Sequence, residues 1–413
     1  MKRVLMVAYH FPPLAGSSGI QRTLRFVQHL PSHGWTAIVL TAHPRAYERT
    51  SDDLVPQIPQ GVVVKRAFAL DAARHFAVAG RYPKFLANPD RWSVWRLGAV
   101  AAGKSLIRDY RPDVLWSTYP IATAHEIGVS LRRASGLPWI ADFRDPMAQE
   151  GYPADPRIHE RFRRVEAAAI DEARLAVFTT PGAARVYRER YPARASHIRV
   201  LENGYDEESF VGLSDRVRLE PLHAGALTLL HSGIVYPSER DPTCMFGALA
   251  RLATAGALLP GRFKLRFRAA GHDDLLHGLT RQYGLAEYVE ILPSLPYREA
   301  LAEMTQADAL LVLQASNCNE QIPAKLYEYL RAGRPILALT DPAGDTAQAL
   351  REAGVTRIAA LDSTDAIVSA MTDFVAAVRT GRAELPDRSH VARLSRREQA
   401  RTLAAWLDEV AAS

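Results

Sequence analysis

The chain has 413 residues, 48% hydrophobic and 23% charged, so it can bury full-sized cores, and its length favours two domains over one. Its two cysteines, Cys244 and Cys318, exclude a disulfide framework and fit a reducing cytoplasm. The net charge of +6 is compatible with an acidic ligand or surface but singles out neither. No segment approaches the roughly 18 consecutive apolar residues of a membrane span, and the apolar run Val4–Ala8 is too short for a signal peptide. We therefore expect a cytoplasmic protein.

The first 40 residues predict the start of a Rossmann-like domain. Apolar runs and helical spacing give a buried strand at 4–8, a turn-rich loop at 11–19, a helix at 20–30 and a strand at 36–40. Gly16 and Gly19 allow a backbone to approach a ligand closely, and ordinary turn chemistry also accounts for them. Ser17 or Ser18 can cap the helix. The loop lacks the G-x-G-x-x-G fingerprint, which disfavours a nicotinamide-dependent dehydrogenase.

The basic segment 65–96 holds seven Lys/Arg against two Asp, with interspersed aromatic residues. The aromatic residues are Phe68, Phe76, Tyr82, Phe85, Trp92 and Trp95. Such a segment suits contact with an anionic membrane surface or a lipid-linked substrate. A solvated basic face around core aromatics explains the same composition equally well. No recognised nucleic-acid-binding module is present, so a nucleic-acid partner is disfavoured.

Residues 98–105 match the P-loop pattern G-x-x-x-x-G-K-S. A P-loop requires a buried strand before its glycines and a long helix after them. Here the stretch 92–110 predicts one continuous helix, followed by a strand at 113–117. We therefore predict that the match is a coincidence and that Lys104 binds no nucleotide.

Charged residues gather at the end of the strand predicted at 138–143. Asp142, Arg144 and Asp145 are site candidates there, because the carboxyl ends of parallel strands form the ligand edge of a sheet. A salt bridge within the loop is the structural alternative. His125 lies on the helix predicted before this strand. The aspartates form no D-x-D, and no His/Cys cluster has metal-ligand spacing, so no metal site is predicted.

The second half of the chain predicts another alternating series. Residues 207–224 lack periodicity and indicate a linker. Strands are predicted at 227–230, 263–269, 289–292, 310–313 and 336–339, with helices between them. The fold class is thus α/β, with two Rossmann-like domains facing across a cleft. We assign 1–207 to the first domain and 208–413 to the second, including a C-terminal helix at 393–410.

The stretch 317–335 carries the most specific chemistry. It predicts a loop and a short helix after a buried strand, with Pro323 at the first helical position and Gly333 as the stop. Helix N–H groups and Lys325 suit an anion such as a nucleotide diphosphate. Glu320 and Glu328, eight positions apart, suit hydrogen bonds from hydroxyls on two parts of one ligand. Taken alone, a solvated helix with a Lys325–Glu328 pair explains the pattern better.

These pieces together resemble a known family. The chain is similar to retaining glycosyltransferases of the GT-B fold, glycosyltransferase family 4, over nearly its whole length. The resemblance rests on Phe11-Pro12-Pro13 with Gly16–Gly19, on Asn203-Gly204-Tyr205-Asp206 with Phe210, on Gly233 with Arg240, and on Glu320-x7-Glu328. The segment Ile322–Tyr329 is similar to members that build bacterial surface polysaccharides.

The resemblance implies roles for individual residues. Glu320 would bind the donor sugar, Glu328 the ribose and Arg240 the diphosphate. The implied donor-binding set is Gly16, Ser17, Ser18, Gly19, Gly233, Arg240, Ile322, Lys325, Leu326 and Glu328. The chain departs from the pattern at Ile234, where many members have a second basic residue, and at Phe143-Arg144-Asp145, where many have a histidine. Arg144 and Asp145 are then the candidates for the catalytic and acceptor side, with His125 in reserve.

The implied reaction moves a sugar from a nucleotide diphosphate sugar, with UDP the expected carrier, to a glycan or lipid-linked acceptor. In metal-free members, cations and helix N–H groups stabilise the departing diphosphate, so neither a metal nor a cofactor is expected. The enzyme would act in the cytoplasm or at the inner face of the plasma membrane. Two alternatives stay open: a non-hydrolysing sugar-nucleotide epimerase of the same architecture, and a non-catalytic subunit that kept the nucleotide pocket.

Overall fold

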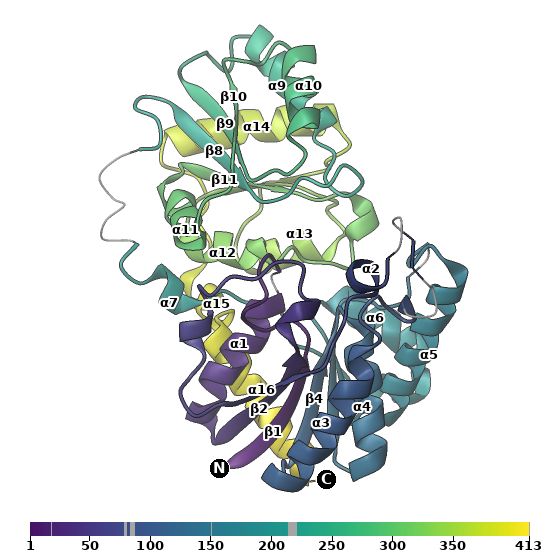
Figure 1. The fold of residues 1–413 in the computed structure, drawn as a ribbon. Coiled ribbons are helices and arrows are strands. Elements are labelled where there is room, and N and C mark those ends of the chain that lie inside the picture. The colour runs from purple at the N-terminus through teal and green to yellow at the C-terminus, as the bar shows by residue number, and fades with distance from the viewer. Residues whose placement is uncertain (18, 78–80, 83–86, 150, 214–220, 413) are drawn as a thin grey trace. The chain divides into compact units, whose positions relative to one another are not determined.

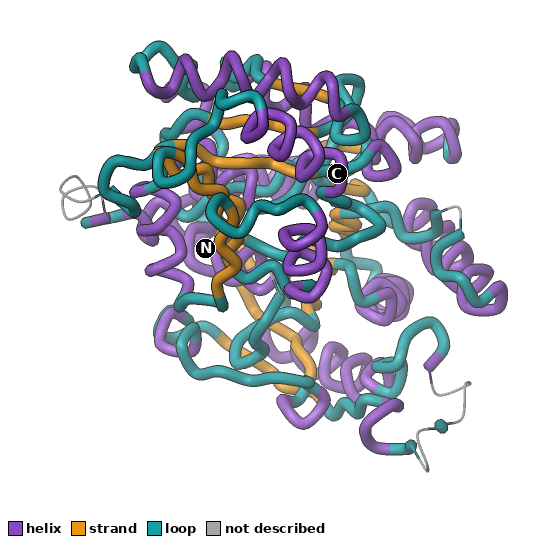
Figure 2. The backbone as a smooth tube through the Cα atoms, turned by 90° about the horizontal axis from the view of Figure 1, so that it is seen from above, coloured by secondary structure: helices purple, strands orange, loops and turns teal. Residues whose placement is uncertain are grey.

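The computed structural model describes residues 1–17, 19–77, 81–82, 87–149, 151–213 and 221–412. The chain forms two compact units, one of residues 1–203 with 396–413 and the other of residues 204–395. The prediction of two Rossmann-like α/β domains is confirmed, because each unit is built on its own parallel sheet. Figure 1 shows the fold, and Figure 2 shows the strands of the sheets among their helices.

The sheet of the first unit has seven strands in the order β3-β2-β1-β4-β5-β6-β7, all paired in parallel. The strands are β1 (Lys2–Ala8), β2 (Trp35–Ala42), β3 (Val63–Ala67), β4 (Val114–Thr118), β5 (Trp139–Arg144), β6 (Leu175–Phe178) and β7 (Ile198–Val200). The helices are α1 (Gly19–His29), α2 (Ala72–His75), α3 (Trp95–Tyr110), α4 (Ala122–Ser135), α5 (Pro156–Glu172), α6 (Pro181–Arg190) and α16 (Arg396–Ala412). Alternate residues of β1 point to opposite faces and build two separate cores.

The C-terminal helix α16 belongs to the first unit, which corrects the predicted second domain of 208–413. Its buried face, with Leu403, Leu407 and Val410, packs in the same core as α1 and as Val4 and Met6 of β1. Figure 1 shows α16 in yellow beside the purple β1, β2 and α1. The units divide between Asn203 and Gly204 rather than after residue 207. The sequence pattern alone showed that the helix is amphipathic but not which sheet it covers.

The sheet of the second unit has six parallel strands in the order β10-β9-β8-β11-β12-β13. They are β8 (Leu227–Ser232), β9 (Phe263–Arg268), β10 (Val289–Leu292), β11 (Ala309–Leu313), β12 (Ile336–Leu339) and β13 (Ile358–Ala359). The helices are α7 (Glu207–Phe210), α9 (Thr243–Thr254), α10 (Asp273–Gln282), α11 (Tyr297–Gln306), α12 (Lys325–Ala332), α13 (Asp345–Glu352), α14 (Thr364–Arg379) and α15 (Arg388–Arg393). One core lies under α9, α10 and α14, and the other under α11, α12 and α13.

One local prediction is confirmed in the structure, and two others change. The P-loop-like residues 98–105 lie inside α3, with the Lys104 side chain exposed, so the prediction of one continuous helix there is confirmed. The linker predicted at 207–224 contains α7, and its residues 214–220 lie outside the described part. The helix predicted at 393–410 is two helices, because the chain turns at Leu394 and Ser395 between α15 and α16. No helix within the described ranges combines the length and hydropathy needed to cross a membrane.

Aromatic residues of the basic segment 65–96 divide between core and surface. Trp95 is fully buried, Trp92 is partly buried and packs on Tyr9, and Phe68 is 50% exposed beside the guanidinium of Arg45. Phe85 lies outside the described residues. Core packing therefore accounts for the tryptophans, and Phe68 alone is a large exposed apolar side chain among the described aromatics of this segment.

Candidate functional site

The order of the second sheet places its switch point between β8 and β11. The chain leaves β8 for β9 and β10 on one side, and later builds β11 to β13 on the other. In open parallel sheets, ligands bind in the crevice at the carboxyl ends of the strands where this reversal occurs. Gly233 follows β8 directly, and the loop 314–324 follows β11 and leads into α12. The structure thus brings the most specific predicted residues to this edge.

Lys325 opens α12 and is held by a histidine of β8. Its Nζ lies 2.9 Å from Nε2 of His231, and Nδ1 of the same imidazole lies 3.0 Å from the carbonyl oxygen of Leu311 on β11. Because the carbonyl can only accept, Nδ1 carries the proton and donates, and Nε2 accepts from the lysine. Burial and the charge of Lys325 lower the pKa of His231 well below its ordinary value, which keeps the ring neutral.

Gly233 and Arg240 lie close to Lys325. Gly233 has φ +120°, and a Cβ there would lie 3.2 Å from Nζ of Lys325, so a side chain would crowd the amine. Arg240 donates from Nη1 to the carbonyl of Ile234 at 2.6 Å and lies 5.3 Å from the ring centroid of Tyr236. Its buried Nε has no hydrogen-bond partner among the described residues. Burial, followed by the charge of Arg240, lowers the pKa of Lys325 well below its ordinary value.

Glu328 lies one turn after Lys325 on α12. One of its oxygens accepts a hydrogen bond of 2.7 Å from the hydroxyl of Tyr297, which starts α11. Tyr329, the next residue, accepts a 2.7 Å hydrogen bond from the backbone N–H of Ser232 and so ties α12 to the end of β8. Lys325 and Glu328 therefore share one face of a helix that is fixed to the end of β8.

The remaining predicted residues of this stretch fall into two groups. Glu320 is partly exposed in the turn before α12. Ile322 and Leu326 are buried in the core of the unit, with Leu326 0% exposed, so their side chains support the site and do not line it. The helix begins at Lys325 rather than at Pro323, because the carbonyl of Pro323 accepts the Leu326 N–H in a turn.

A hollow of about 340 Å³ opens beside this loop at the ends of β11, β12 and β13. Its lining residues include Asp241, Gln314, Ser316, Asp341 and Asp362. The side-chain amide of Gln314 donates to the carbonyls of Cys318 and Gln321, at 3.0 Å each, and fixes the loop that carries Glu320. Polar acceptors around such a hollow suit the hydroxyl groups of a ligand, and Glu320 is not among the lining residues.

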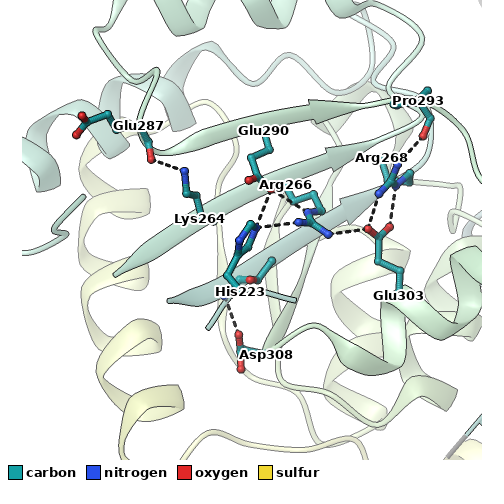
Figure 3. Close-up of polar contacts among 10 residues, drawn as sticks. His223, Lys264, Arg266, Arg268, Glu287, Glu290, Pro293, Glu303 and Asp308 are labelled. Carbon is teal, nitrogen blue, oxygen red and sulfur yellow. Dashed lines mark hydrogen bonds and ion pairs between the residues drawn. The ribbon is translucent and has the colours of Figure 1, made fainter. Parts of the chain in front are cut away.

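Two arginines of β9 are structural (Figure 3). Arg268 donates to Glu303 at 2.6 and 2.8 Å and to the carbonyl of Pro293 at 2.9 Å, and Arg266 donates to Glu303 and Glu290 at 2.9 Å each. His223 joins the same network through Glu290. Every guanidinium here has carboxylate partners, in contrast with Arg240. The network fixes the segments that follow β9 and β10 near the ligand edge.

In the first unit, the predicted glycine loop meets the end of β5. A Cβ on Gly19 would lie 2.5 Å from Nη1 of Arg144 and 2.5 Å from Nδ1 of His10, so a side chain there would have to displace both groups. The hydroxyl of Ser17 lies 3.0 Å from Nδ1 of His10 and accepts the N–H of Gly19 at 3.3 Å. Gly16 has φ +83°, a turn conformation that favours glycine. Ser18 lies outside the described residues.

Asp142 and Arg144 have different roles, although they stand two residues apart. Asp142 accepts from Nε and Nη2 of Arg22 at 2.8 and 2.9 Å, and both side chains are almost fully buried. This is a structural ion pair between α1 and β5, and not the salt bridge within the loop that the sequence offered as the alternative. The register of β5 against β6 shifts between Asp142 and Arg144, and Arg144 has φ +61°. Burial raises the pKa of Asp145, and the charge of Arg144 opposes that shift.

His125 lies in the core of the first unit, which corrects its assignment as an acceptor residue. It is 0% exposed, and its Nδ1 lies 2.8 Å from the hydroxyl of Ser117. Its ring packs against Phe143 and Trp139, and burial lowers its pKa to about 3. A side chain with no exposed surface cannot contact an acceptor. The helical spacing of α4 left open whether this histidine faces a ligand or the sheet.

Sequence reasoning did not single out His10, His231 or Tyr297 as site residues. A polar residue at the carboxyl end of an apolar strand was the available signal for His10 and His231. Tyr297 begins a helix after Pro296, and only the three-dimensional structure brings it to Glu328.

The chain resembles known proteins in part of its sequence and in its fold. Residues 18–204 match the family model described as a glycosyl transferase 4-like domain. No curated protein matches the chain. Solved structures of the same fold include alpha,alpha-trehalose 6-phosphate synthase from Burkholderia multivorans, with 14% identity over 100% of this chain and 97% of that one and a TM-score of 0.67.

Two further structures share the fold. Alr3699/HepE of Anabaena, in complex with UDP and glucose, has 14% identity over 100% of this chain and 98% of that one, with a TM-score of 0.61. UDP-GlcNAc 2-epimerase from Neisseria meningitidis, bound to UDP-GlcNAc, has 10% identity over 99% and 100%, with a TM-score of 0.58. At these identities the likeness shows the fold, and the two-domain GT-B architecture is confirmed.

Proposed function

We propose that this protein is a retaining glycosyltransferase that moves a hexosyl or N-acetylhexosaminyl group from a UDP-linked sugar to a glycan or lipid-linked acceptor in polysaccharide synthesis. The observation that carries the proposal is the convergence of Lys325 and Arg240 at the switch point of the second sheet, with Glu328 one helical turn away. Cations suit the diphosphate, and the carboxylate suits a ribose hydroxyl. The glycosyl transferase 4-like match of residues 18–204 supports the same activity.

Each cation has a defined part in the proposed reaction. As the bond between sugar and diphosphate breaks, negative charge grows on the leaving oxygens, and preorganised cations stabilise that charge more than they stabilise the substrate. Arg240 offers an unpartnered Nε, and Lys325 is already oriented by His231. Glu320 would accept hydrogen bonds from the donor sugar. Because two side chains supply positive charge, we propose a metal-independent transfer.

A retaining reaction without an enzymic nucleophile requires the acceptor to attack from the side of the departing diphosphate. A phosphate oxygen would then take the proton of the acceptor hydroxyl, so the new glycosidic bond forms as the old one breaks. The acceptor side is proposed to lie on the first unit near Arg144 and Asp145. A lipid-linked acceptor would place the enzyme at the inner face of the plasma membrane.

The test begins with a thermal-shift panel of nucleotide sugars, because a ligand raises stability in proportion to how far it exceeds its dissociation constant. Transfer is then measured in Arg240→Ala and Glu320→Ala, where we expect turnover to fall at least about 100-fold with folding intact. Arg251→Ala is the matched control, because Arg251 pairs with Asp365 on the exposed surface. Wild-type rates in both site variants would refute the assignment.

Product analysis separates transfer from the alternatives. An epimerase would convert the sugar nucleotide without an acceptor, whereas a transferase needs one. A non-catalytic subunit would bind the nucleotide sugar and leave it unchanged.

A further inference from the structure

Four arginines line one hollow on the outer helical layer of the first unit. The hollow has a volume of about 180 Å³ and lies where α4 packs between α3 and α5, three helices that Figure 1 shows side by side. Neither Arg144 nor Asp145 lines it, so it is separate from the proposed acceptor side. The arginines are Arg96 of α3, Arg133 of α4, and Arg161 and Arg164 of α5.

Helical spacing turns one face of α4 and one face of α5 to the hollow. The lining residues of α4 lie at positions 126, 129, 130 and 133, and those of α5 at 161, 164, 165 and 168. Both sets follow the spacing i, i+3, i+4 and i+7, which keeps side chains on one side of a helix. Val129 and Val165 are buried and form the floor, whereas the side chains of Arg133 and Arg164 are mostly exposed at the rim.

Positive charge exceeds negative charge in this hollow. Glu126 is the one acidic residue among the described lining residues, and it stands against four guanidinium groups. Burial raises the pKa of Glu126, and the charges of Arg161 and Arg96 oppose that rise, so both cations lie near its carboxylate. Arg96 is exposed and forms no ion pair with any described residue. The other three arginines have one partner each, in the pairs Arg161–Glu126, Arg164–Glu160 and Arg133–Glu172.

These pairs leave guanidinium N–H groups available. Arg161 reaches Glu126 through Nη2, and Arg164 reaches Glu160 through Nε at 2.9 Å, and neither arginine uses a second nitrogen on a described residue. Surface pairs of this kind are weak, so an anion with several acceptor oxygens can compete for the same donors.

We propose that this hollow binds a phosphate group. A phosphate monoester carries about two negative charges and three strong acceptor oxygens, which match the forked donors of arginine. Pockets for drug-sized ligands begin at roughly 300 Å³, so this smaller hollow admits a phosphate group but not a whole nucleotide. The site is built entirely from helices of the first unit and does not rest on the proposed sugar transfer.

The first test is calorimetry with inorganic phosphate at constant ionic strength on the full-length chain. Arg96→Gln combined with Arg164→Gln should weaken binding about tenfold, because two charged donors are lost. Arg108→Gln combined with Arg251→Gln is the matched control, because both arginines are exposed, paired with aspartates and absent from the hollow. No phosphate binding by the parent chain, equal binding in the first variant, or an equal loss in the control would overturn the proposal.

A second variant should strengthen binding. Glu126→Gln removes the carboxylate that competes with phosphate for Arg161 and Arg96, so we expect several-fold tighter phosphate binding. Ordinary surface ion pairs without a ligand site would give no such gain. Unchanged or weaker binding in Glu126→Gln would contradict the proposal.

Hydrogen exchange followed by mass spectrometry locates the bound phosphate. We expect phosphate to slow exchange in peptides that cover residues 126–133 and 161–168, and the effect should shrink in the Arg96→Gln/Arg164→Gln chain. Protection confined to other segments would place the anion elsewhere and overturn the site.

A phosphate group reaches the protein either as a solute or as a lipid headgroup. The parent chain and the Arg96→Gln/Arg164→Gln chain are therefore also sedimented with phosphatidylcholine vesicles that contain or lack phosphatidic acid. A loss of affinity for inorganic phosphate alone assigns the site to a soluble ligand, and an added loss for phosphatidic acid vesicles assigns it to a headgroup. Unchanged affinity for both would overturn the proposal. None of these measurements requires sugar transfer, so their outcome is independent of the proposed activity.

Discussion

The Nζ of Lys325 lies 2.9 Å from Nε2 of His231, so a neutral imidazole fixes the one lysine of α12 at the end of β8. His231→Asn keeps a donor toward Leu311 but loses the acceptor for the lysine, whereas His231→Gln can offer an oxygen near the position of Nε2. We expect UDP affinity to fall about tenfold in His231→Asn and less in His231→Gln, while uridine affinity stays unchanged. Calorimetry measures the affinities of both variants for UDP and for uridine. Equal losses of affinity for the two ligands would contradict the prediction.

Binding of a nucleotide diphosphate should be accompanied by proton uptake. Burial and Arg240 lower the pKa of Lys325, and a diphosphate beside the amine would raise it again. At a pH above the lowered pKa of the ligand-free amine, the lysine therefore gains a proton when the anion binds. Calorimetry of UDP binding in buffers of different ionisation enthalpy measures the uptake, which should shrink in Lys325→Met. Proton release, or an unchanged uptake in that variant, would argue against the predicted contact.

Arg22 and Asp142 should stabilise the first unit only as a pair. Arg22→Met leaves a buried carboxylate unpaired and should cost about 3–5 kcal/mol of unfolding free energy, whereas Arg22→Met combined with Asp142→Leu should cost less. Urea denaturation of the parent chain, Arg22→Met, Asp142→Leu and the double variant completes a double-mutant cycle. Additive losses would show that the two charges do not interact in solution.

Acid should weaken the fold through His125. The native imidazole stays neutral down to about pH 3, whereas an unfolded histidine takes up a proton below about pH 6.5. The unfolded state then binds more protons, so the contribution of His125 is complete above pH 6.5 and falls by about 1.4 kcal/mol by pH 5.5. The difference in stability between wild type and His125→Phe, measured by denaturation at pH 7.5 and 5.5, should change by that amount.

Lys104 should be dispensable for nucleotide binding. It is exposed on α3, inside the P-loop-like pattern but without P-loop geometry. Lys104→Ala should leave UDP affinity unchanged and unfolding free energy within about 0.5 kcal/mol of wild type. Loss of nucleotide binding in this variant would restore the P-loop interpretation.

Alternation of apolar strands and amphipathic helices was enough to predict the central strands of both sheets, because burial on both faces leaves near-continuous apolar runs such as Ala309–Leu313. The edge strands β3 and β13 were not predicted. Spacing also placed Lys325 and Glu328 on one face of a helix. The partners of these residues come from other strands and helices, so no local pattern contains the His231–Lys325 or Tyr297–Glu328 contacts.

The same limit explains the errors. His125 lies on α4, and both α4 and α16 are amphipathic helices. Their residue spacing shows that one side of each helix is buried, but it does not show which elements that side packs against. Arg144 shows the opposite case: its position at a strand end was visible in the sequence, but its left-handed backbone was not.

The second unit is inserted into the first, since α16 returns to the sheet that residues 1–203 build. During synthesis on the ribosome, the apolar face that includes Val4, Met6 and Leu24 therefore stays uncovered by α16 until Leu403 and Leu407 have emerged. The whole of residues 204–395 must be translated in that interval. The first unit is thus the first to begin synthesis and the last to be completed. A chaperone that shields this apolar face could act throughout the synthesis of residues 204–395.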